Sequence, residues 1–426
     1  MNVLVVGSGG REHALCWKIG ASPLVGEVFC APGNGGIASD AVCVDIPADD
    51  IPALIKFARS NDVGLTVVGP EAPLIAGIVD AFESERLPVF GPTKSAACLE
   101  GSKSFAKEMM QRASIPTARF AVFTDLDAAR AYISSADFPL VVKADGLAAG
   151  KGVIVTSSKD EALEALNEIM VARAFGEAGS RVVIEERLAG EEASFIAICD
   201  GEHIVPLASS QDHKPVFDGD RGPNTGGMGA YSPAPVLDEA SQGLVMEKIL
   251  YPLVHAMKLA GITYRGVIYA GLMMTDGGPQ VLEFNARMGD PETQPLLMRL
   301  KSDLVPLLLE TALKGSIRDM ELDWDSSPSV CVVMASGGYP GSYEKGKPIG
   351  GIDDAEAIPG VKVFHAGTRL EKGRVLTAGG RVLGVTALGD GLEGTILKAY
   401  RAVSCISFEG MHFRRDIGRK ALSRLS

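Results

Sequence analysis

The stretch VLEFNARMGDPE, Val281–Glu292, contains the most informative polar pattern in the chain. Its first residues alternate, so we expect Leu282 and Phe284 on one face of a strand and Glu283 and Asn285 on the other. A carboxylate beside an amide offers the hard oxygen ligands that Mg²⁺ takes from proteins, together with water and phosphate. The same pair could lie on the solvated face of an edge strand. Because a Gly-Asp-Pro turn ends the strand directly after these residues, the pattern favours a metal site.

Arg287 continues the polar side of this strand. Its planar guanidinium can bind a carboxylate or a phosphate through two parallel hydrogen bonds. The strand therefore offers a carboxylate- or phosphate-binding group beside the candidate metal site.

Length, composition and charge restrict the class of protein. A chain of 426 residues is too long for one core and predicts two to four domains. A hydrophobic content of 46% with 22% charged residues is typical of a globular protein, and the net charge of −12 argues against nucleic-acid or membrane partners. The seven cysteines form no Cys-x-x-Cys pair, which indicates a reducing compartment. With no signal peptide and no spanning segment in the sequence, we expect a cytoplasmic protein.

Residues 1–102 alternate short apolar strands with helical stretches, and a Gly or Pro turn follows each strand. This pattern predicts a parallel, doubly wound α/β domain. The expected strands are Asn2–Val6, Glu27–Cys30, Val42–Asp45, Leu65–Val68 and Val89–Phe90.

The rest of the chain predicts an α+β arrangement in two further domains, at 103–325 and 326–426, with a flap subdomain at about 118–190. The stretch Ser209–Pro235 is rich in Gly, Pro and Asp. We expect a long, irregular loop there, and a structureless loop of this length inside a domain is usually functional. The basic tail Phe413–Lys420 is expected to be a solvated amphipathic end, or to pack through Ile417 and Leu422, and not to be a phosphate site.

The N-terminal turn VVGSGGREHAL, Val5–Leu15, follows a strand and opens a helix. It is similar to a dinucleotide-binding turn, but Glu12 stands at the third glycine position and no acidic residue closes the second strand. An NAD enzyme is therefore disfavoured. The backbone N–H groups of Gly9 and Gly10 could form an anion site, or the turn could serve packing alone. Glu71, at the end of another strand, could bind a hydroxyl or an amine.

The stretch VVKADGLAAGKGV, Val141–Val153, places Lys143 on a strand and Lys151 in a glycine-rich loop before a second strand. No Ser or Thr follows Lys151 and no helix follows the loop, so the stretch is not a Walker A loop. It suits a flap that closes over a triphosphate, although a hairpin with surface lysines remains an alternative. The glycines of this flap are Gly146, Gly150 and Gly152.

A strand ending at Glu185-Glu186 turns at Gly190 and continues into another strand. Such a crossover could offer backbone groups to adenine and the Glu192 carboxylate to a ribose, or its acidic residues could simply be solvated.

These motifs in this order resemble the ATP-grasp superfamily of carboxylate–amine ligases, and within it the glycinamide ribonucleotide synthetase family. The matching segments are VLVVGSGGREHAL, APGNGG, GPEAPL, KADGLAAGKGV, QDHKPVFDGDRGPNTGGMGAYSP, LEFNARMGDPETQ and GGRVLGVTA. The resemblance implies an ATP-grasp domain pair that ligates glycine to 5-phosphoribosylamine through glycyl phosphate, in purine biosynthesis. It also implies ATP, a divalent ion (Mg²⁺ or Mn²⁺) and a monomer. The alternative is another ATP-grasp enzyme of purine synthesis, such as a formate-dependent glycinamide-ribonucleotide transformylase, from which the loop Gln211–Pro235 distinguishes it.

The resemblance also implies roles for individual residues. The nucleotide would be bound by Lys103, Lys143, the flap residues Gly146, Gly150, Lys151 and Gly152, the hinge residues Glu185, Glu186 and Leu188, and Glu192, with Lys143 also catalytic. The metal would be bound by Glu283 and Asn285. The ribonucleotide amine would be bound by Gly9, Gly10, Glu71 and Arg381. For glycine, we expect Arg287 to bind the carboxylate as a catalytic residue, with Asp212 and Lys214, or Asp290, as further contacts. Many relatives place a further acidic metal ligand on the preceding strand, where Val267–Gly271 has no carboxylate, so the number of metal ions stays open.

Overall fold

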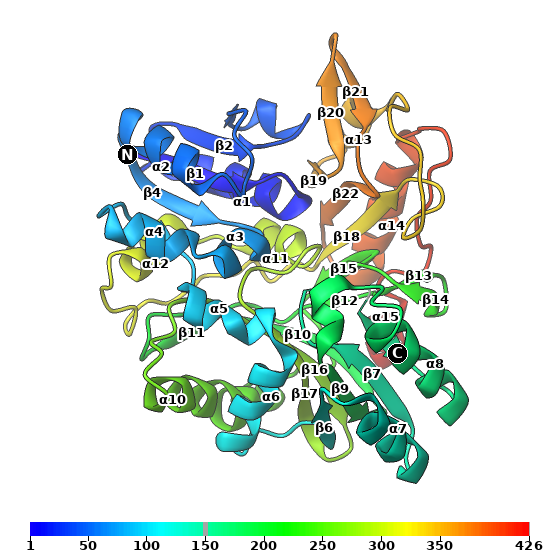
Figure 1. The fold of residues 1–426 in the computed structure, drawn as a ribbon. Helices are drawn as coiled ribbons and strands as arrows, with labels where there is room; N and C mark the ends of the chain where they lie inside the picture. Colours follow the sequence, from blue (N-terminus) through cyan, green and yellow to red (C-terminus); the bar gives the residue numbers. More distant parts are fainter. Residues whose placement is uncertain (148–151, 426) are drawn as a thin grey trace.

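The computed structural model describes residues 1–147 and 152–425 (Figure 1). Within these residues the strands form two five-stranded, two four-stranded and two two-stranded sheets. Parallel and antiparallel sheets coexist, which confirms the predicted combination of α/β and α+β units. No helix in this part of the chain is long and apolar enough to cross a membrane.

The N-terminal sheet is parallel, with the strand order β3-β2-β1-β4-β5. Its strands are β1 (Asn2–Gly7), β2 (Val28–Pro32), β3 (Val42–Cys43), β4 (Val63–Val68) and β5 (Val89–Phe90), and its helices are α1 (Gly10–Gly20), α2 (Ile51–Ser60), α3 (Glu71–Ala76), α4 (Ile78–Ser84) and α5 (Lys94–Gly101). Val3 and Val5 of β1 lie in one buried core, and Leu4 and Val6 lie in another. Both faces are therefore covered, which confirms the doubly wound prediction.

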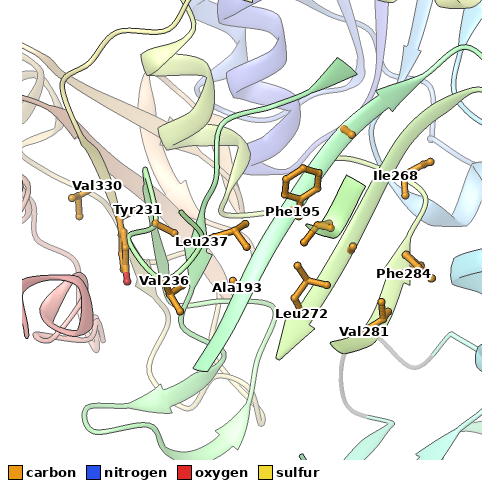
Figure 2. Packing of buried hydrophobic residues seen from close by; sticks show 14 of the residues in the cluster. Ala193, Phe195, Tyr231, Val236, Leu237, Ile268, Leu272, Val281, Phe284 and Val330 are labelled. Carbon is orange, nitrogen blue, oxygen red and sulfur yellow. The ribbon is translucent and has the colours of Figure 1, made fainter. Parts of the chain in front are cut away.

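The middle of the chain forms two four-stranded sheets, which lie in the lower part of the view in Figure 1. One, in the order β6-β9-β7-β8, contains β6 (Phe120–Phe123), β7 (Leu140–Ala144), β8 (Val153–Val155) and β9 (Val182–Glu186), with helices α7 (Leu126–Ser135) and α8 (Lys159–Met170). The other, in the order β11-β10-β16-β17, contains β10 (Glu191–Cys199), β11 (Ile204–Pro206), β16 (Gly266–Thr275) and β17 (Gly278–Asn285). The remaining helices here are α6 (Lys103–Arg112), α9 (Glu239–Val245), α10 (Tyr251–Leu259), α11 (Thr293–Arg299) and α12 (Val305–Ala312). Figure 2 shows side chains of β10, β16 and β17 in the buried core, among them Phe195, Leu272 and Phe284.

A β-bulge in β17 changes the predicted alternation of its side chains. Glu283 pairs with Gly271 and Val281 pairs with Leu272, so Leu282 is an extra residue between two pairs. Val281 and Phe284 are consequently buried, whereas Leu282 is only half-buried. The expectation that Leu282 and Phe284 alternate regularly with the polar pair is wrong, because a bulge interrupts the period of two.

The C-terminal sheet contains two strands from the stretch that was predicted to be an irregular loop. Its order is β12-β15-β18-β22-β19, with β12 (Gln211–Asp212), β15 (Gly229–Ser232), β18 (Ser329–Ala335), β19 (Val361–His365) and β22 (Arg381–Leu388). Residues Gly229–Ser232 pair with Ser329–Val332, about one hundred residues later. The prediction of one long structureless loop is therefore wrong, because distant pairing overrides the local Gly and Pro signals.

Two small hairpins and three helices complete the structure. The hairpins are β13 (Pro215–Phe217) with β14 (Arg221–Asn224), and β20 (Thr368–Glu371) with β21 (Arg374–Thr377); the helices are α13 (Ile352–Glu356), α14 (Leu392–Cys405) and α15 (Arg419–Leu425). Short 3₁₀ turns lie at Ile37–Ser39 and Gly176–Ser180, and a π-helical turn lies at Met246–Leu250.

The N-terminal and C-terminal sheets are joined through His13 on α1 and His365 at the end of β19. The His365 backbone N–H donates to His13 Nδ1 at 2.7 Å, so His13 Nε2 carries the proton and donates to Asp40 Oδ2 at 2.8 Å. Asn34 Nδ2 donates to the His365 carbonyl at 2.8 Å. Burial lowers the pKa of His365 to about 3, with His13 and Lys362 contributing in the same direction.

We expect this neutral His365 to make folding sensitive to acid. Its folded pKa lies below the unfolded value, so the unfolded state binds the proton first and the free energy of unfolding falls as the pH falls below about 6.5. At pH 5 the loss from this residue is about 2 kcal/mol. Urea unfolding of wild type and His365→Asn between pH 5 and pH 8 should show a smaller pH dependence in the variant. The exposed His255→Asn is the control, and an equal pH dependence in wild type and His365→Asn would contradict the prediction.

Candidate active site

A cleft of about 800 Å³ lies where the N-terminal turns, the central sheets and the C-terminal sheet approach one another. This volume suits ligands larger than a single amino acid. The predicted site residues that line it are Gly9, Glu71, Lys103, Lys143, Gly152, Glu185, Asp212, Lys214, Glu283, Asn285, Arg287, Asp290 and Arg381. Gly10, Gly146, Glu186, Leu188 and Glu192 do not line it, and Gly150 and Lys151 fall outside the described residues.

The candidate metal ligands lie on β17 among cationic side chains. Lys214 Nζ is 3.6 Å from Glu283 Oε1, and Arg287 Nη2 donates to Asn285 Oδ1 at 3.3 Å. Burial would raise the pKa of Glu283, but Lys214, Lys143 and Lys103 outweigh it and lower the pKa to about 2. Glu283 is therefore an anion at any physiological pH, and both oxygen donors already face positive charge.

These donors fit a magnesium ion. Among residues 1–147 and 152–425, no group of three His, Cys, Asp or Glu residues could hold a metal ion. One carboxylate and one amide are nevertheless sufficient for Mg²⁺, which keeps several waters and takes phosphate oxygens as its other ligands. The site thus suits an ion that arrives with a phosphate compound.

Lys143 and Glu185 belong to a buried ion-pair network at the junction of β7, β9 and α6. Lys143 Nζ lies 2.9 Å from Glu185 Oε1 and donates to the Leu282 carbonyl at 3.1 Å. Lys107 Nζ lies 3.0 Å from Glu185 Oε2, and burial lowers the pKa of Lys107 to about 8. Lys107 was not predicted from the sequence, although it follows Lys103 by one helical turn and so faces the same side of α6.

Three other residues predicted to bind the nucleotide, Lys103, Glu186 and Glu192, contact other parts of the protein. Lys103 Nζ donates to the Gly146 carbonyl at 3.2 Å, which places the start of the flap beside α6. Glu186 forms an ion pair with the exposed Arg119 at 2.9 Å, and Glu192 forms one with Lys214 at 3.1 Å. Both carboxylates therefore have protein partners in this structure.

Arg287 is held by two carboxylates from the N-terminal part of the chain. Its Nη2 lies 3.0 Å from Glu100 Oε1 and its Nε lies 3.4 Å from Glu71 Oε2. Glu100 also accepts the Ala286 backbone N–H at 2.7 Å. Burial alone would lower the pKa of Arg287, but Glu100 and Glu71 raise it. Glu100 was not predicted from the sequence as a site residue. Its position among the apolar residues of α5 is the signal that could have indicated a buried carboxylate.

Two further carboxylates of the cleft, Asp212 and Glu292, lie in buried surroundings. Burial raises the pKa of Asp212 to about 8, although Lys214 acts in the opposite direction. Glu292 Oε1 accepts from Tyr269 Oη at 2.8 Å and from Ser194 Oγ at 3.0 Å, and both Glu292 and Tyr269 line the cleft. Ser194 lies on β10, Tyr269 on β16 and Glu292 directly before α11, so no local spacing in the sequence predicts that these three side chains meet.

At the N-terminal turn, one of the two backbone donors predicted to bind an anion is paired with a side chain of the same helix. The Gly9 N–H donates to Glu12 Oε2 at 2.6 Å, and Arg11 Nε donates to Glu12 Oε1 at 2.5 Å. The Glu12 side chain thus occupies the backbone donor that an anion would need, and Gly10 packs against Gln294 without lining the cleft. Gly9 nevertheless lines the cleft, and no partner is recorded for the Gly10 N–H among the described residues, so the Gly9–Gly10 anion site stays a prediction.

Arg381 connects the C-terminal sheet to the turn after β17. Its Nη1 donates to the Asp290 carbonyl at 2.5 Å and to the Gly226 carbonyl at 2.8 Å, and its Nη2 lies 3.5 Å from Asp290 Oδ2. Asp290 also accepts from Gln294 Nε2 at 3.0 Å. Two of the residues predicted to bind substrate therefore lie next to each other, although 91 positions separate them in the sequence.

Solved structures share the overall fold of this chain. A crystal structure of phosphoribosylamine–glycine ligase from Thermotoga maritima superposes with a TM-score of 0.84 at 35% identity and covers 98% of this chain and 100% of that chain. The biotin carboxylase domain of 2-oxoglutarate carboxylase from Hydrogenobacter thermophilus has a TM-score of 0.73 at 16% identity, covering 97% of this chain and 91% of that one. The second likeness concerns the fold alone.

Sequence comparisons give the same relationship over the full chain. The phosphoribosylamine–glycine ligase of Allochromatium vinosum is 56% identical over 429 residues, covering 100% of this chain and 99% of its own. That of Yersinia pestis is 52% identical over 428 residues, covering 100% of both. Three models of phosphoribosylglycinamide synthetase match: the N domain at residues 1–100, the ATP-grasp (A) domain at 101–293 and the C domain at 329–420. This chain therefore belongs to the phosphoribosylglycinamide synthetase family.

Proposed function

We propose that this protein is a phosphoribosylamine–glycine ligase, which uses ATP to join glycine to 5-phosphoribosylamine in purine biosynthesis. The products are glycinamide ribonucleotide, ADP and phosphate. The main structural support is the anionic Glu283 with Asn285, flanked by Lys103, Lys143 and Lys214 and followed by Arg287. This arrangement suits a reaction in which a nucleotide triphosphate and a carboxylate meet.

The reaction has two steps. A carboxylate oxygen of glycine attacks the γ-phosphorus of ATP, the bond from that phosphorus to the β–γ bridging oxygen breaks, and glycyl phosphate and ADP form. The amine nitrogen of 5-phosphoribosylamine then attacks the acyl carbon. The bond from that carbon to the phosphate oxygen breaks, phosphate leaves, and the nitrogen loses a proton to solvent.

Residues of this chain would contribute mainly charge and orientation. Lys143 and Lys103 would neutralise phosphate oxygens, and the Arg287 fork would orient the glycine carboxylate and then the acyl phosphate. Asp212, Lys214 and Asp290 would hold glycine, while Glu71 and Arg381 would face the ribonucleotide amine. ATP-grasp enzymes in general bind ATP and Mg²⁺; here Glu283 and Asn285 would hold the ion, which supplies charge neutralisation to the phosphates.

Several finer properties belong to the same proposal. We propose that Mn²⁺ can replace Mg²⁺, that the protein acts as a monomer in the cytoplasm, and that residues 1–102, 103–325 and 326–426 are its domains. The flap subdomain would be the part of the middle domain at about 118–190. Glu185, Glu186, Leu188 and Glu192 would lie near the adenosine.

The decisive experiment measures ADP release in the presence of ATP and Mg²⁺. We expect release to require both glycine and 5-phosphoribosylamine generated in situ, because the acyl phosphate must be consumed for turnover. A reaction driven by formate and glycinamide ribonucleotide, with no need for glycine, would instead support a transformylase and overturn the proposal.

A further inference from the structure

The hairpin β13–β14 begins and ends at the cleft. Lys214 precedes its first strand, and Thr225 follows its second strand; both line the cleft. The Thr225 N–H and Oγ1 donate to the Lys214 carbonyl at 2.8 and 2.7 Å, so the two ends are fixed to each other. Any displacement of the hairpin therefore moves Lys214, whose Nζ pairs with Glu192 and Glu283.

Such a hairpin has little stability of its own. It forms a separate two-stranded sheet, and Phe217 within it is half exposed. Isolated two-stranded hairpins are marginally stable in water. Its position must therefore come from contacts outside the hairpin.

Val216 of the hairpin is buried against Met228 and Ala335, and its carbonyl pairs with His412 Nε2 at 2.9 Å. The charged contacts come from Arg414 of the C-terminal tail, a residue that is only 1% exposed. Its Nη1 donates to the Pro215 carbonyl at 3.0 Å and to Asp220 Oδ1 at 2.9 Å. Its Nε and Nη2 donate to Asp416 Oδ1 and Oδ2, each at 2.8 Å. A buried arginine is tolerated only when its charge is paired, and here both sides of the fork are engaged.

Neighbouring residues of the tail hold the hairpin turn as well. Asp416 Oδ2 accepts the Gly219 N–H at 2.8 Å, and the Arg415 backbone N–H donates to Asp218 Oδ1 at 2.7 Å. Lys420 Nζ lies 2.6 Å from Asp220 Oδ2. Of the two alternatives expected for Phe413–Lys420, the packing of Ile417 is confirmed and the solvated end is wrong, because Arg414 and Ile417 are buried and the tail lies against the hairpin.

We propose that Arg414 is a positioning residue for the glycine side of the active site, acting through the β13–β14 hairpin and Lys214. This inference rests on the proposed function. On the nucleotide side, Lys103, Lys143 and Glu185 lie on α6, β7 and β9. The hydrogen bonds recorded for Arg414 go to Pro215, Asp220 and Asp416, and none of them reaches these three elements. Lys214 is a cleft residue directly beside the hairpin, so loosening the hairpin should affect glycine most, and the ion pairs of Lys214 with Glu192 and Glu283 should pass only a smaller effect to the ATP side.

Two variants test the proposal, each with the full-length protein. Arg414→Lys keeps a cation but cannot bind both partners with a planar fork, and Asp416→Asn weakens the same contacts without removing the buried arginine. For both we expect the KM for glycine to rise about tenfold while the KM for ATP changes less than about twofold. Arg415→Ala, a neighbouring change at an exposed side chain, should leave both values unchanged.

A second measurement reports on the hairpin without activity. Arg221 is exposed at the start of β14, and trypsin should cleave after it about tenfold faster in Arg414→Lys and Asp416→Asn than in wild type. Unchanged cleavage in both variants, or equal increases in the KM for glycine and for ATP, would overturn the positioning role. If wild type itself fails to show glycine-dependent ADP release, the proposed function fails, and the cleavage result still decides whether the tail holds the hairpin.

Discussion

Replacing Glu283 with glutamine is expected to reduce glycine-dependent ADP release at least about a thousandfold, because it removes the anionic member of the proposed metal site. Glutamine has nearly the same size and keeps one oxygen donor. It cannot, however, supply the negative charge that Mg²⁺ and the three surrounding lysines require. The loss should therefore appear in turnover and not in folding.

The measurement is a titration of ADP release with Mg²⁺ in wild type and Glu283→Gln, accompanied by thermal unfolding. A non-activity readout is the Mg²⁺-dependent rise in melting temperature with a non-hydrolysable ATP analogue, which the variant should lose. Asp276→Asn is the matched control, since Asp276 is an exposed acidic residue in the turn joining β16 to β17. Near wild-type turnover by Glu283→Gln at ordinary Mg²⁺ concentrations would exclude Glu283 as the metal ligand.

Much of the fold follows from local pattern. The strands of the N-terminal sheet are short apolar runs, and β1 is buried on both faces, so its side chains supply two cores. The polar pair on β17 also follows from alternation and from the turn after it. These features depend on residues close together in the sequence, so the local pattern of apolar and polar residues is sufficient to predict them.

The parts that could not be predicted depend on distant partners. β15 pairs with β18, and nothing within Gly229–Ser232 itself indicates a partner one hundred residues away. The bulge at Leu282 follows from the pairing of β17 with β16, not from the composition of β17. Glu100 and Arg414 are ordinary charged residues in sequence, and only burial against Arg287 and the β13–β14 hairpin distinguishes them.

The predicted anion site at the N-terminal turn illustrates a second limit. The helix N-terminus was correctly placed, but its Gly9 donor is used by a side chain from its own first turn. A glutamate at the third helical position pairs with the N–H that precedes the helix and leaves the N–H groups of the first helical residues for other partners. Glu12, which argued against NAD, therefore removes one donor of this turn and leaves the Gly9–Gly10 anion site as a prediction.

Replacing Arg287 with lysine is expected to lower kcat/KM for glycine by about a hundredfold, with a smaller effect on the KM for ATP. Lysine keeps the charge but loses the planar fork, and a point charge cannot orient a carboxylate through two parallel bonds. It also cannot reach Glu100 and Glu71 in the fixed geometry that now holds Arg287 at 3.0 and 3.4 Å.

Glu100→Gln provides the comparison that separates orientation from charge. Glutamine can still accept the Ala286 N–H, so the turn should persist, but the charged partner of Arg287 is lost. We expect a decrease in kcat/KM of about tenfold, smaller than for Arg287→Lys because Glu71 remains. In the double variant the two losses should not add, since Glu100 would act only through Arg287. Fully additive losses would mean that Glu100 affects the reaction by another route, and full activity of Arg287→Lys would exclude the fork as the carboxylate-binding group.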